Sequence, residues 1–227
     1  PTFVNAVTEV FVGANAHVDL YEIQDDHEHG SAVNSVQAYQ ERDSVFRTSA
    51  FTLSGEVIRN HVSILPDGEG CESHMYGLFL GDGSMHVDTH TLVDHAKPNC
   101  FSNELFKGVL DDVSTGVFNG KVLVRQDAQQ INAYQSNKSI LLSETARMYS
   151  KPELEIYADD VKCAHGAAIG QMDEAARYYM ASRGIPPETA RKLLVRAFIG
   201  DAFVALEDDA EQERMLAAAL DALGDTV

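Results

Sequence analysis

Most of the chain, from residue 1 to about residue 168, is a succession of short β-prone runs with turn residues between them. Runs such as 77–80, 105–110 and 117–124 are rich in Val, Leu and Phe, and they are bounded by Gly, Asn and Asp. Helical periodicity is hard to find over this whole length. This part of the chain is therefore restricted to an all-β architecture, which is a sandwich, a closed barrel or a solenoid.

The brevity of the runs favours the solenoid. We expect strands of about three to six residues with connectors of about one to four, whereas hairpin sheets usually run longer strands. The pairs Asn119-Gly120 and Ser136-Asn137 suit the tight corners of a β-helix, in which each rung buries its inward side chains against its neighbours. No strict repeat period is present, so a sandwich or a cupin-like barrel stays open as an alternative.

Toward the C-terminus the sequence period changes to that of a helix. Asp173 is placed to cap a helix that ends at Arg183, with Gly184 directly after it. Pro186 and Pro187 open a second helix, and a third begins in the acidic run 207–209. Three short helices have little core of their own, so we expect them to pack on the β region, on a partner, or on both.

Charge and cysteine usage narrow the possible partners and compartments. The chain carries 35 acidic against 17 basic side chains, a formal net charge of −18, which disfavours binding to nucleic acid or to an anionic membrane surface. Cys71, Cys100 and Cys163 are far apart in the sequence and form no CxxC pair, which fits a reducing cytoplasm or an equivalent organelle interior. No apolar run approaches the roughly 20 residues of a membrane span.

Two unbroken strings stand out, residues 154–167 (LEIYADDVKCAHGA) and residues 86–95, which contain an HxDxHT stretch. The first resembles the end of the core of the SufB/SufD family of the SUF iron–sulfur cluster assembly system, and the second resembles that family's own HxDxHT stretch. Residues 182–185 are similar to the family's helical tail. Further similar strings are 107–110, 116–121, 127–129 and 135–137. The resemblance covers the chain from about residue 40 onward.

The resemblance implies a mainly β fold, a right-handed parallel β-helix followed by a small C-terminal α-helical domain. On this basis we divide the chain into a β-helix core, residues 1–170, and a helical domain, residues 171–227. It also implies that the family's N-terminal region is missing from this sequence, which opens inside a strand-like stretch.

Two features resemble the SufD type and not the SufB type. Residues 162–166 stand where SufB-type chains carry a glutamate-rich stretch, and no cysteine lies between Cys100 and Cys163. The SufD type implies a non-enzymatic scaffold subunit that acts in a complex with SufB and the ATPase SufC. It also suggests pairing through the last rungs of the β-helix, with SufB in the cell and as a homodimer when isolated.

Cys163 and His165 are the candidate cluster-binding residues. They are separated by one residue, so in a strand their side chains project from the same face, and both thiolate and imidazole ligate iron. Taken alone, a Cys-x-His pair in a strand is more often structural. The resemblance implies that His165 lies at the SufB interface and is a candidate iron ligand. Because two ligands cannot hold a cluster, we expect a transient iron–sulfur cluster shared with SufB and no cofactor bound tightly to the isolated chain.

His86, Asp88 and His90 support the rival hypothesis, a metal-dependent, cupin-like β-barrel enzyme. In a strand these three side chains would share one face, as a 2-His-1-carboxylate site requires, with His95 and Asp94 nearby. Polar side chains stacked in adjacent rungs can also form a structural hydrogen-bonded ladder, and the family resemblance favours that interpretation. The sequence has no GxSxG elbow, P-loop or GxGxxG fingerprint, so any ATP would be bound by a partner.

Overall fold

The computed structural model describes residues 2–25, 29–203, 206 and 209–223, which contain twelve β-strands followed by helices. The strands are β1 (Thr2–Val12), β2 (His17–Asp25), β3 (Gly30–Gln40), β4 (Val45–Ser54), β5 (Val57–Pro66), β6 (Glu72–Gly81), β7 (His86–His95), β8 (Phe101–Leu110), β9 (Thr115–Val124), β10 (Ile131–Leu141), β11 (Arg147–Ile156) and β12 (Val161–Gln171). The helices are α1 (Glu174–Ser182), α2 (Pro187–Gly200), the 3₁₀ turn η1 (Asp201–Phe203) and α3 (Asp209–Ala222).

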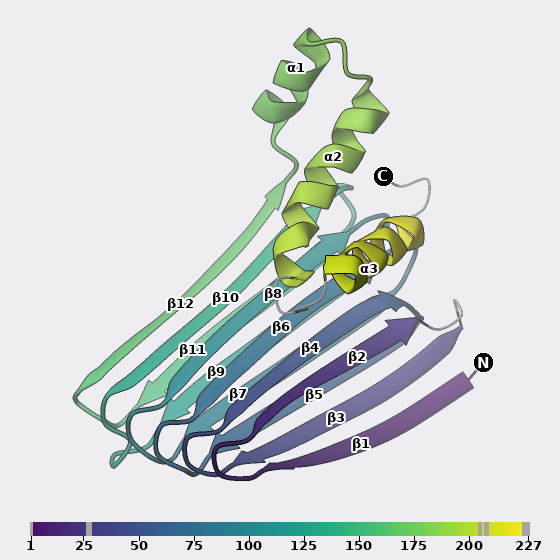
Figure 1. The fold of residues 1–227 in the computed structure, drawn as a ribbon. Coiled ribbons are helices and arrows are strands. Elements are labelled where there is room, and N and C mark those ends of the chain that lie inside the picture. Colours follow the sequence, from purple (N-terminus) through teal and green to yellow (C-terminus); the bar gives the residue numbers. More distant parts are fainter. Residues whose placement is uncertain (1, 26–28, 204–205, 207–208, 224–227) are drawn as a thin grey trace.

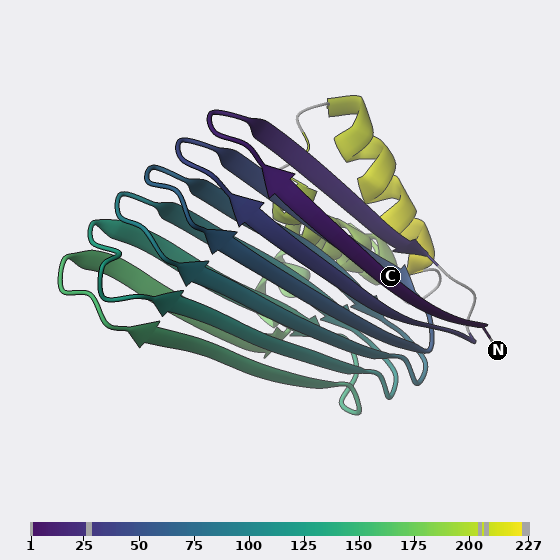
Figure 2. The ribbon, with the colours of Figure 1, turned by 90° about the horizontal axis from the view of Figure 1, so that it is seen from below.

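The strands alternate between two parallel sheets. The odd sheet has the order β1-β3-β5-β7-β9-β11, and the even sheet has the order β12-β10-β8-β6-β4-β2. Every strand pairs in parallel with the strand two places along the chain, so one rung consists of one strand from each sheet (Figures 1 and 2). The parallel β-helix is therefore confirmed, and the sandwich and the closed barrel are wrong.

The strands are longer than the sequence pattern predicts. They run for 9 to 11 residues. Each rung is flattened and has only two strands, so each strand spans the whole width of the rung. Asn119-Gly120 and Ser136-Asn137 lie inside β9 and β10 and not at corners. Gly120 is there for a different reason: a Cβ atom on it would lie 2.4 Å from Nε2 of Gln135.

The corners instead use Asn, Asp, Gln and Gly with a left-handed backbone. The non-glycine residues with positive φ are Asn15, Asp43, Asn99, Asp112 and Gln130. Asn and Asp tolerate this region because their short polar side chains bond to the local backbone. The rung length also varies. Ser31 pairs with Val57, 26 residues on, whereas Thr115 pairs with Arg147, 32 residues on. This variation explains why no strict repeat period is visible in the sequence.

The space between the sheets is an apolar core over most of its length. In β7 and β9 every second residue is buried, as expected for strands with one face inward. Phe46, Phe79 and Phe118 are almost completely buried there, and the rings of Phe106 and Phe118 lie 5.1 Å apart. Each such side chain stabilises the fold by about 1.5–3 kcal/mol relative to exposure.

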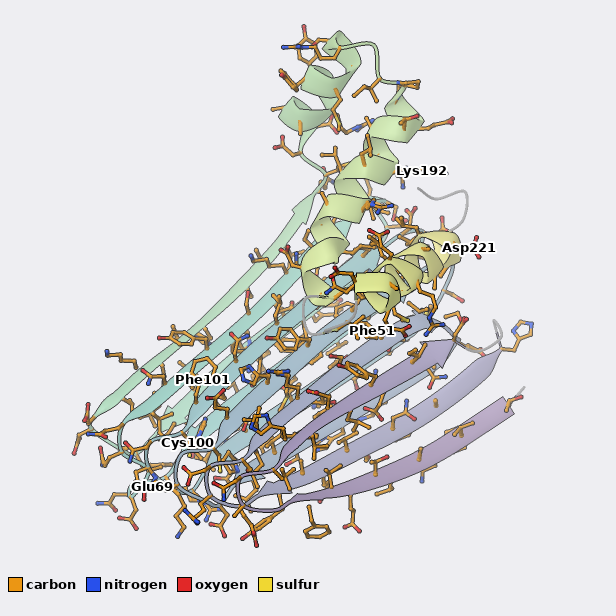
Figure 3. All side chains as sticks on the ribbon, viewed as in Figure 1. Phe51, Glu69, Cys100, Phe101, Lys192 and Asp221 are labelled. Carbon is orange, nitrogen blue, oxygen red and sulfur yellow. The ribbon has the colours of Figure 1, made fainter. Side chains whose placement is uncertain are left out.

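A second core joins the helices to the outer face of the even sheet. Phe51, Leu78 and Val109 on this face pack with residues of α2, η1 and α3, and the rings of Phe51 and Phe203 lie 5.0 Å apart. Figure 1 shows α2 and α3 over this sheet, and Figure 3 labels Phe51 beneath α3. The expectation that the helices pack on the β region is therefore confirmed.

Lys107 connects the even sheet to the helices that pack on it, α2, η1 and α3. Its ammonium is buried on β8 and donates to the Phe198 carbonyl at 2.5 Å and to the Asp201 carboxylate at 2.7 Å. The same ammonium lies 4.6 Å from the centroid of the Phe198 ring. The end of α2 and the start of η1 are thus tied to the even sheet.

The helix boundaries follow local sequence signals. Asp173 caps α1 by accepting from the backbone N–H groups of Ala175 and Ala176, and Gly184 follows the helix with φ of 80°. Pro187 is the first residue of α2, as predicted. Glu207 and Asp208 lie outside the described residues, and the third helix is described from Asp209. None of the helices in the described ranges is both long and apolar enough to cross a membrane.

Candidate functional site at the last rung

The C-terminal end of the β-helix is open. In the described part of the chain β12 pairs only with β10, and β11 pairs only with β9. Residues 164–171 of β12 are exposed, because no further rung covers the side chains that point inward. Each end strand therefore presents a row of N–H and C=O groups that can pair with another chain.

Cys163 and His165 lie on this last rung. Their in-register partners on β10 are Ala133 and Gln135, both of which are buried and point into the β-helix. Cys163 and His165 therefore share one face, as predicted, and the structure shows that it is the inward face. Cys163 is half-buried, and burial raises the pKa of its thiol, partly offset by a hydrogen bond with the Ala133 backbone. The His165 side chain is exposed at the open end.

A column of polar residues runs inward from His165. Glu104, Gln135 and His165 occupy in-register positions on β8, β10 and β12. Glu104 Oε2 accepts from the Thr91 hydroxyl at 2.6 Å and from Gln135 Nε2 at 3.2 Å. Burial raises the pKa of Glu104 to about 7, even though both hydrogen bonds favour its charged form. A buried carboxyl therefore lies two rungs behind the candidate ligand.

The interior of the last rungs is also rich in unpaired acceptors. Five buried oxygen atoms have no hydrogen-bond partner among the described residues: Glu104 Oε1, Gln135 Oε1, Asn137 Oδ1, Ser139 Oγ and Ser150 Oγ. Most buried polar atoms in proteins are paired, so this concentration distinguishes the C-terminal rungs from the apolar core. Sequence analysis missed these residues, because the spacing that aligns them is the rung length, which varies.

The metal site of the rival hypothesis, on β7, does not form. His86, Asp88 and His90 share a face, as expected, but it is the outer face of the odd sheet. His90 Nε2 lies 2.9 Å from Asp88 Oδ1, and Arg59 donates to the other oxygen of Asp88 at 2.7 Å. Within the described ranges no three His, Cys, Asp or Glu side chains are grouped to hold a metal ion. The Arg59–Asp88 contact joins two adjacent rungs on the surface, and the His90–Asp88 contact lies within β7.

His95 is separated from the other histidines because it points inward. It is completely buried, and its Nε2 lies 2.9 Å from the Ser102 hydroxyl. Burial lowers the pKa of His95 to about 4, so its imidazole is neutral at physiological pH. The barrel enzyme that this histidine group suggested is therefore not supported by the fold or by the positions of its proposed ligands.

The other two cysteines form a buried pair at the corner end of the rungs. The Gly68 carbonyl lies within hydrogen-bond distance of both thiols, 3.2 Å from Cys71 Sγ and 3.3 Å from Cys100 Sγ. Hydrogen bonding between the thiols lowers the pKa of Cys71 to about 6 and raises that of Cys100. Figure 3 labels Cys100 and Glu69 at this corner, far from the helices. The pair contacts backbone carbonyls, and the half-buried Cys163 of the last rung packs against the apolar cluster that contains both thiols.

Comparison with known proteins identifies the family. Residues 1–198 match the SufBD core domain of the SUF system of iron–sulfur cluster assembly. The chain belongs to the SufBD family. The resemblance inferred from residues 86–95 and 154–167 is thereby confirmed.

Its relatives in the SufBD family include proteins named for SufD. The chain is 32% identical to the iron–sulfur cluster assembly protein SufD of Escherichia coli over 95% of its own length, and 31% identical to SufD of Bacillus subtilis over 86%. It is 35% identical to a SufBD family protein of Synechocystis over 88%. The matched region makes up 51%, 45% and 44% of these three relatives, so the chain spans about half of their length.

Proposed function

We propose that this SufBD family chain is a SufD-type scaffold subunit, without enzymatic activity of its own, that assembles iron–sulfur clusters together with SufB and the ATPase SufC. The observation that carries the proposal is the open last rung, where Cys163 and His165 share an inward face that nothing in the described part of the chain covers. Names of relatives from Escherichia coli and Bacillus subtilis support the SufD type. The free cysteines fit a reducing cytoplasm.

The open rung provides the contact with SufB. The unpaired edges of β11 and β12 can each accept a strand from a second β-helix, which continues the two sheets across the interface. When the chain is isolated, a second copy takes the same place around a two-fold axis, giving a homodimer. Such pairing covers the exposed Ile169, whose side chain is 45% exposed on β12.

The same interface holds the cluster. Cys163 and His165 offer a thiolate and an imidazole, which are soft and intermediate ligands suited to iron and to iron–sulfur clusters. Since a cluster needs more ligands than two, SufB supplies the others, and the cluster is transient cargo. The raised pKa of Cys163 means that iron must displace its proton on binding.

The helices provide the contact with SufC. No residue of α1 is buried, and Tyr178 and Tyr179 on it are 79% and 59% exposed. Leu193 of α2 is 43% exposed. Exposed aromatic side chains on a helix that packs on little else are typical of a protein contact. Because the sequence contains no P-loop, SufC binds the ATP.

Co-purification of the chain with SufB and SufC tests the proposal. An Ile169→Lys variant places a charge in the proposed interface and should lose SufB, because an edge lysine opposes strand addition. The matched control is Ile23→Lys on β2, at the other end of the same sheet and 48% exposed, which should retain SufB. If Ile169→Lys binds SufB as well as the wild type does, the last rung is not the interface.

Surface variants are a sharper test of the SufC contact than removal of the helices. Truncation would expose the apolar face around Phe51 and Leu78, so a loss of binding could follow from aggregation. A Tyr178→Ser variant changes only an exposed side chain and should weaken SufC binding. Val113→Ser, at a β-helix corner and 58% exposed, is the control that should not. Equal SufC binding by both variants would contradict the assignment of α1.

A further inference from the structure

The orientation of the Gln135 amide is determined by its neighbours. Its Nε2 donates to Glu104 Oε2, which also accepts from Thr91. Above the pKa of Glu104, about 7, the carboxylate is ionised and only accepts, so the nitrogen of the amide faces Glu104. On the other side of the interior, Gly120 leaves room for the amide, since a Cβ atom there would lie 2.4 Å from Nε2. The amide is therefore held with its nitrogen toward β8.

This arrangement leaves the carbonyl oxygen of Gln135 available. Gln135 is 3% exposed, and its Oε1 is buried with no partner among the described residues. An unpaired acceptor in a protein interior costs about 1–3 kcal/mol, so a donor that reaches it is stabilising. The next in-register residue on the open side is His165. In-register residues of neighbouring strands lie about 4.8 Å apart, within reach of an imidazole and an amide on the same face.

We propose that Gln135 is a positioning residue for His165, accepting a hydrogen bond from one imidazole nitrogen at Oε1 and thereby leaving the other nitrogen free to bind iron. The bond forms when a partner covers the last rung and excludes the water that now surrounds the exposed imidazole. Metal-binding histidines generally donate their second ring N–H to a fixed acceptor, which sets the tautomer and the ring orientation. This inference rests on the proposed role of His165.

The column therefore has a division of roles. Thr91 and Glu104 fix the Gln135 amide, Gln135 fixes the imidazole, and His165 is the member of the column that touches the cargo, beside Cys163. Neither Glu104 nor Gln135 binds iron, since both are buried behind the last rung.

Nitrogen NMR of the histidine rings in the complex with SufB tests the proposal at pH 8, above the pKa of Glu104. In the wild type, His165 should show one neutral tautomer with a ring N–H that exchanges slowly with water. In a Gln135→Met variant, which keeps the side-chain length but lacks the acceptor, both tautomers should appear and exchange should be fast. Iron affinity of the complex should fall by about 10-fold or more, as for other partners of ligating histidines.

Asn137→Leu is the matched control. Asn137 is on the same strand and face, is equally buried and also has an unpaired oxygen, but its in-register partner is Ala167. This variant should leave the His165 tautomer unchanged. If the Gln135→Met protein does not fold, the wild-type spectrum still decides: two tautomers or fast exchange at His165 in the complex would overturn the proposal.

The two proposals fail differently. If His165→Ala has wild-type cluster content, the proposed role of His165 fails, whatever Gln135 does. If His165→Ala loses clusters while Gln135→Met keeps the single tautomer and the iron affinity, the positioning role of Gln135 alone is wrong.

Discussion

Gln135 donates to the buried carboxyl group of Glu104 across 3.2 Å in the interior of the β-helix, in the rung next to the open end. The contact joins two in-register positions on β8 and β10, and the Thr91 hydroxyl reaches the same oxygen from the opposite sheet at 2.6 Å. Two hydrogen bonds do not compensate for complete burial, so the pKa of Glu104 stays raised, at about 7. Burial of the Glu104 carboxylate therefore costs stability, while the same group holds the Gln135 amide that we propose positions His165.

Glu104→Gln should stabilise the protein at alkaline pH. The pKa of Glu104 is higher in the folded chain, about 7, than its ordinary value of 4.5, so the folded state binds the proton more tightly. Wild-type stability therefore falls as the pH rises from about 4.5 to about 7. The free energy of unfolding of the variant should exceed that of the wild type by about 3 kcal/mol at pH 8 and match it near pH 4. Urea titrations at both pH values measure this, with the exposed Glu144→Gln as the control. A difference independent of pH would contradict the assignment.

His95→Asn should have the opposite pH dependence. Burial lowers the pKa of His95 from 6.5 to about 4, so the unfolded chain binds the proton more tightly, and wild-type stability is lost as the pH falls from about 6.5 to about 4. The variant should lack this contribution, about 3 kcal/mol between pH 7 and pH 4. Thermal unfolding across this range tests it. A pH profile of His95→Asn identical to that of the wild type would contradict the lowered pKa of His95.

Lys107→Met should loosen the helical layer without unfolding the β-helix. The variant leaves the Phe198 carbonyl without its charged donor, and hydrogen bonds to charged groups contribute about 1.5–3 kcal/mol. Hydrogen exchange of the amides in α2 and α3 should become faster, while that in β5 and β7 should not. Exposed Lys97→Met is the control. Equal acceleration in all elements would mean that Lys107 supports the whole fold.

The helices were the most predictable part of the structure from sequence, because their signals are local. Asp173, Gly184 and Pro187 each act on the backbone within one turn, so the residue types alone place the helix ends. The resemblance to the SufB/SufD family supplied the β-helix, which the pattern alone left open. The face shared by Cys163 and His165 followed from the two-residue period of a strand.

What sequence analysis missed depends on register between rungs. Glu104 and Gln135 are 31 residues apart, and Gln135 and His165 are 30 apart, so no local window connects them. Sequence analysis placed Gly120 at a corner, but it lies inside a strand. Glycine is favoured both in turns and where another group approaches the backbone closely, so the residue type alone does not distinguish the two. His90 and His95 are five residues apart on β7, so strand alternation puts them on opposite faces, but only the packing of the two sheets shows which face is inward.

The most direct test of the account is the iron and sulfide content of the proposed complex with SufB and SufC after anaerobic purification. We compare the wild type with His165→Ala and with His17→Ala, an exposed histidine at the far end of the same sheet. The account predicts that all three complexes form, that His165→Ala contains several-fold less iron and sulfide, and that His17→Ala matches the wild type. A His165→Ala complex with wild-type iron and sulfide would contradict it.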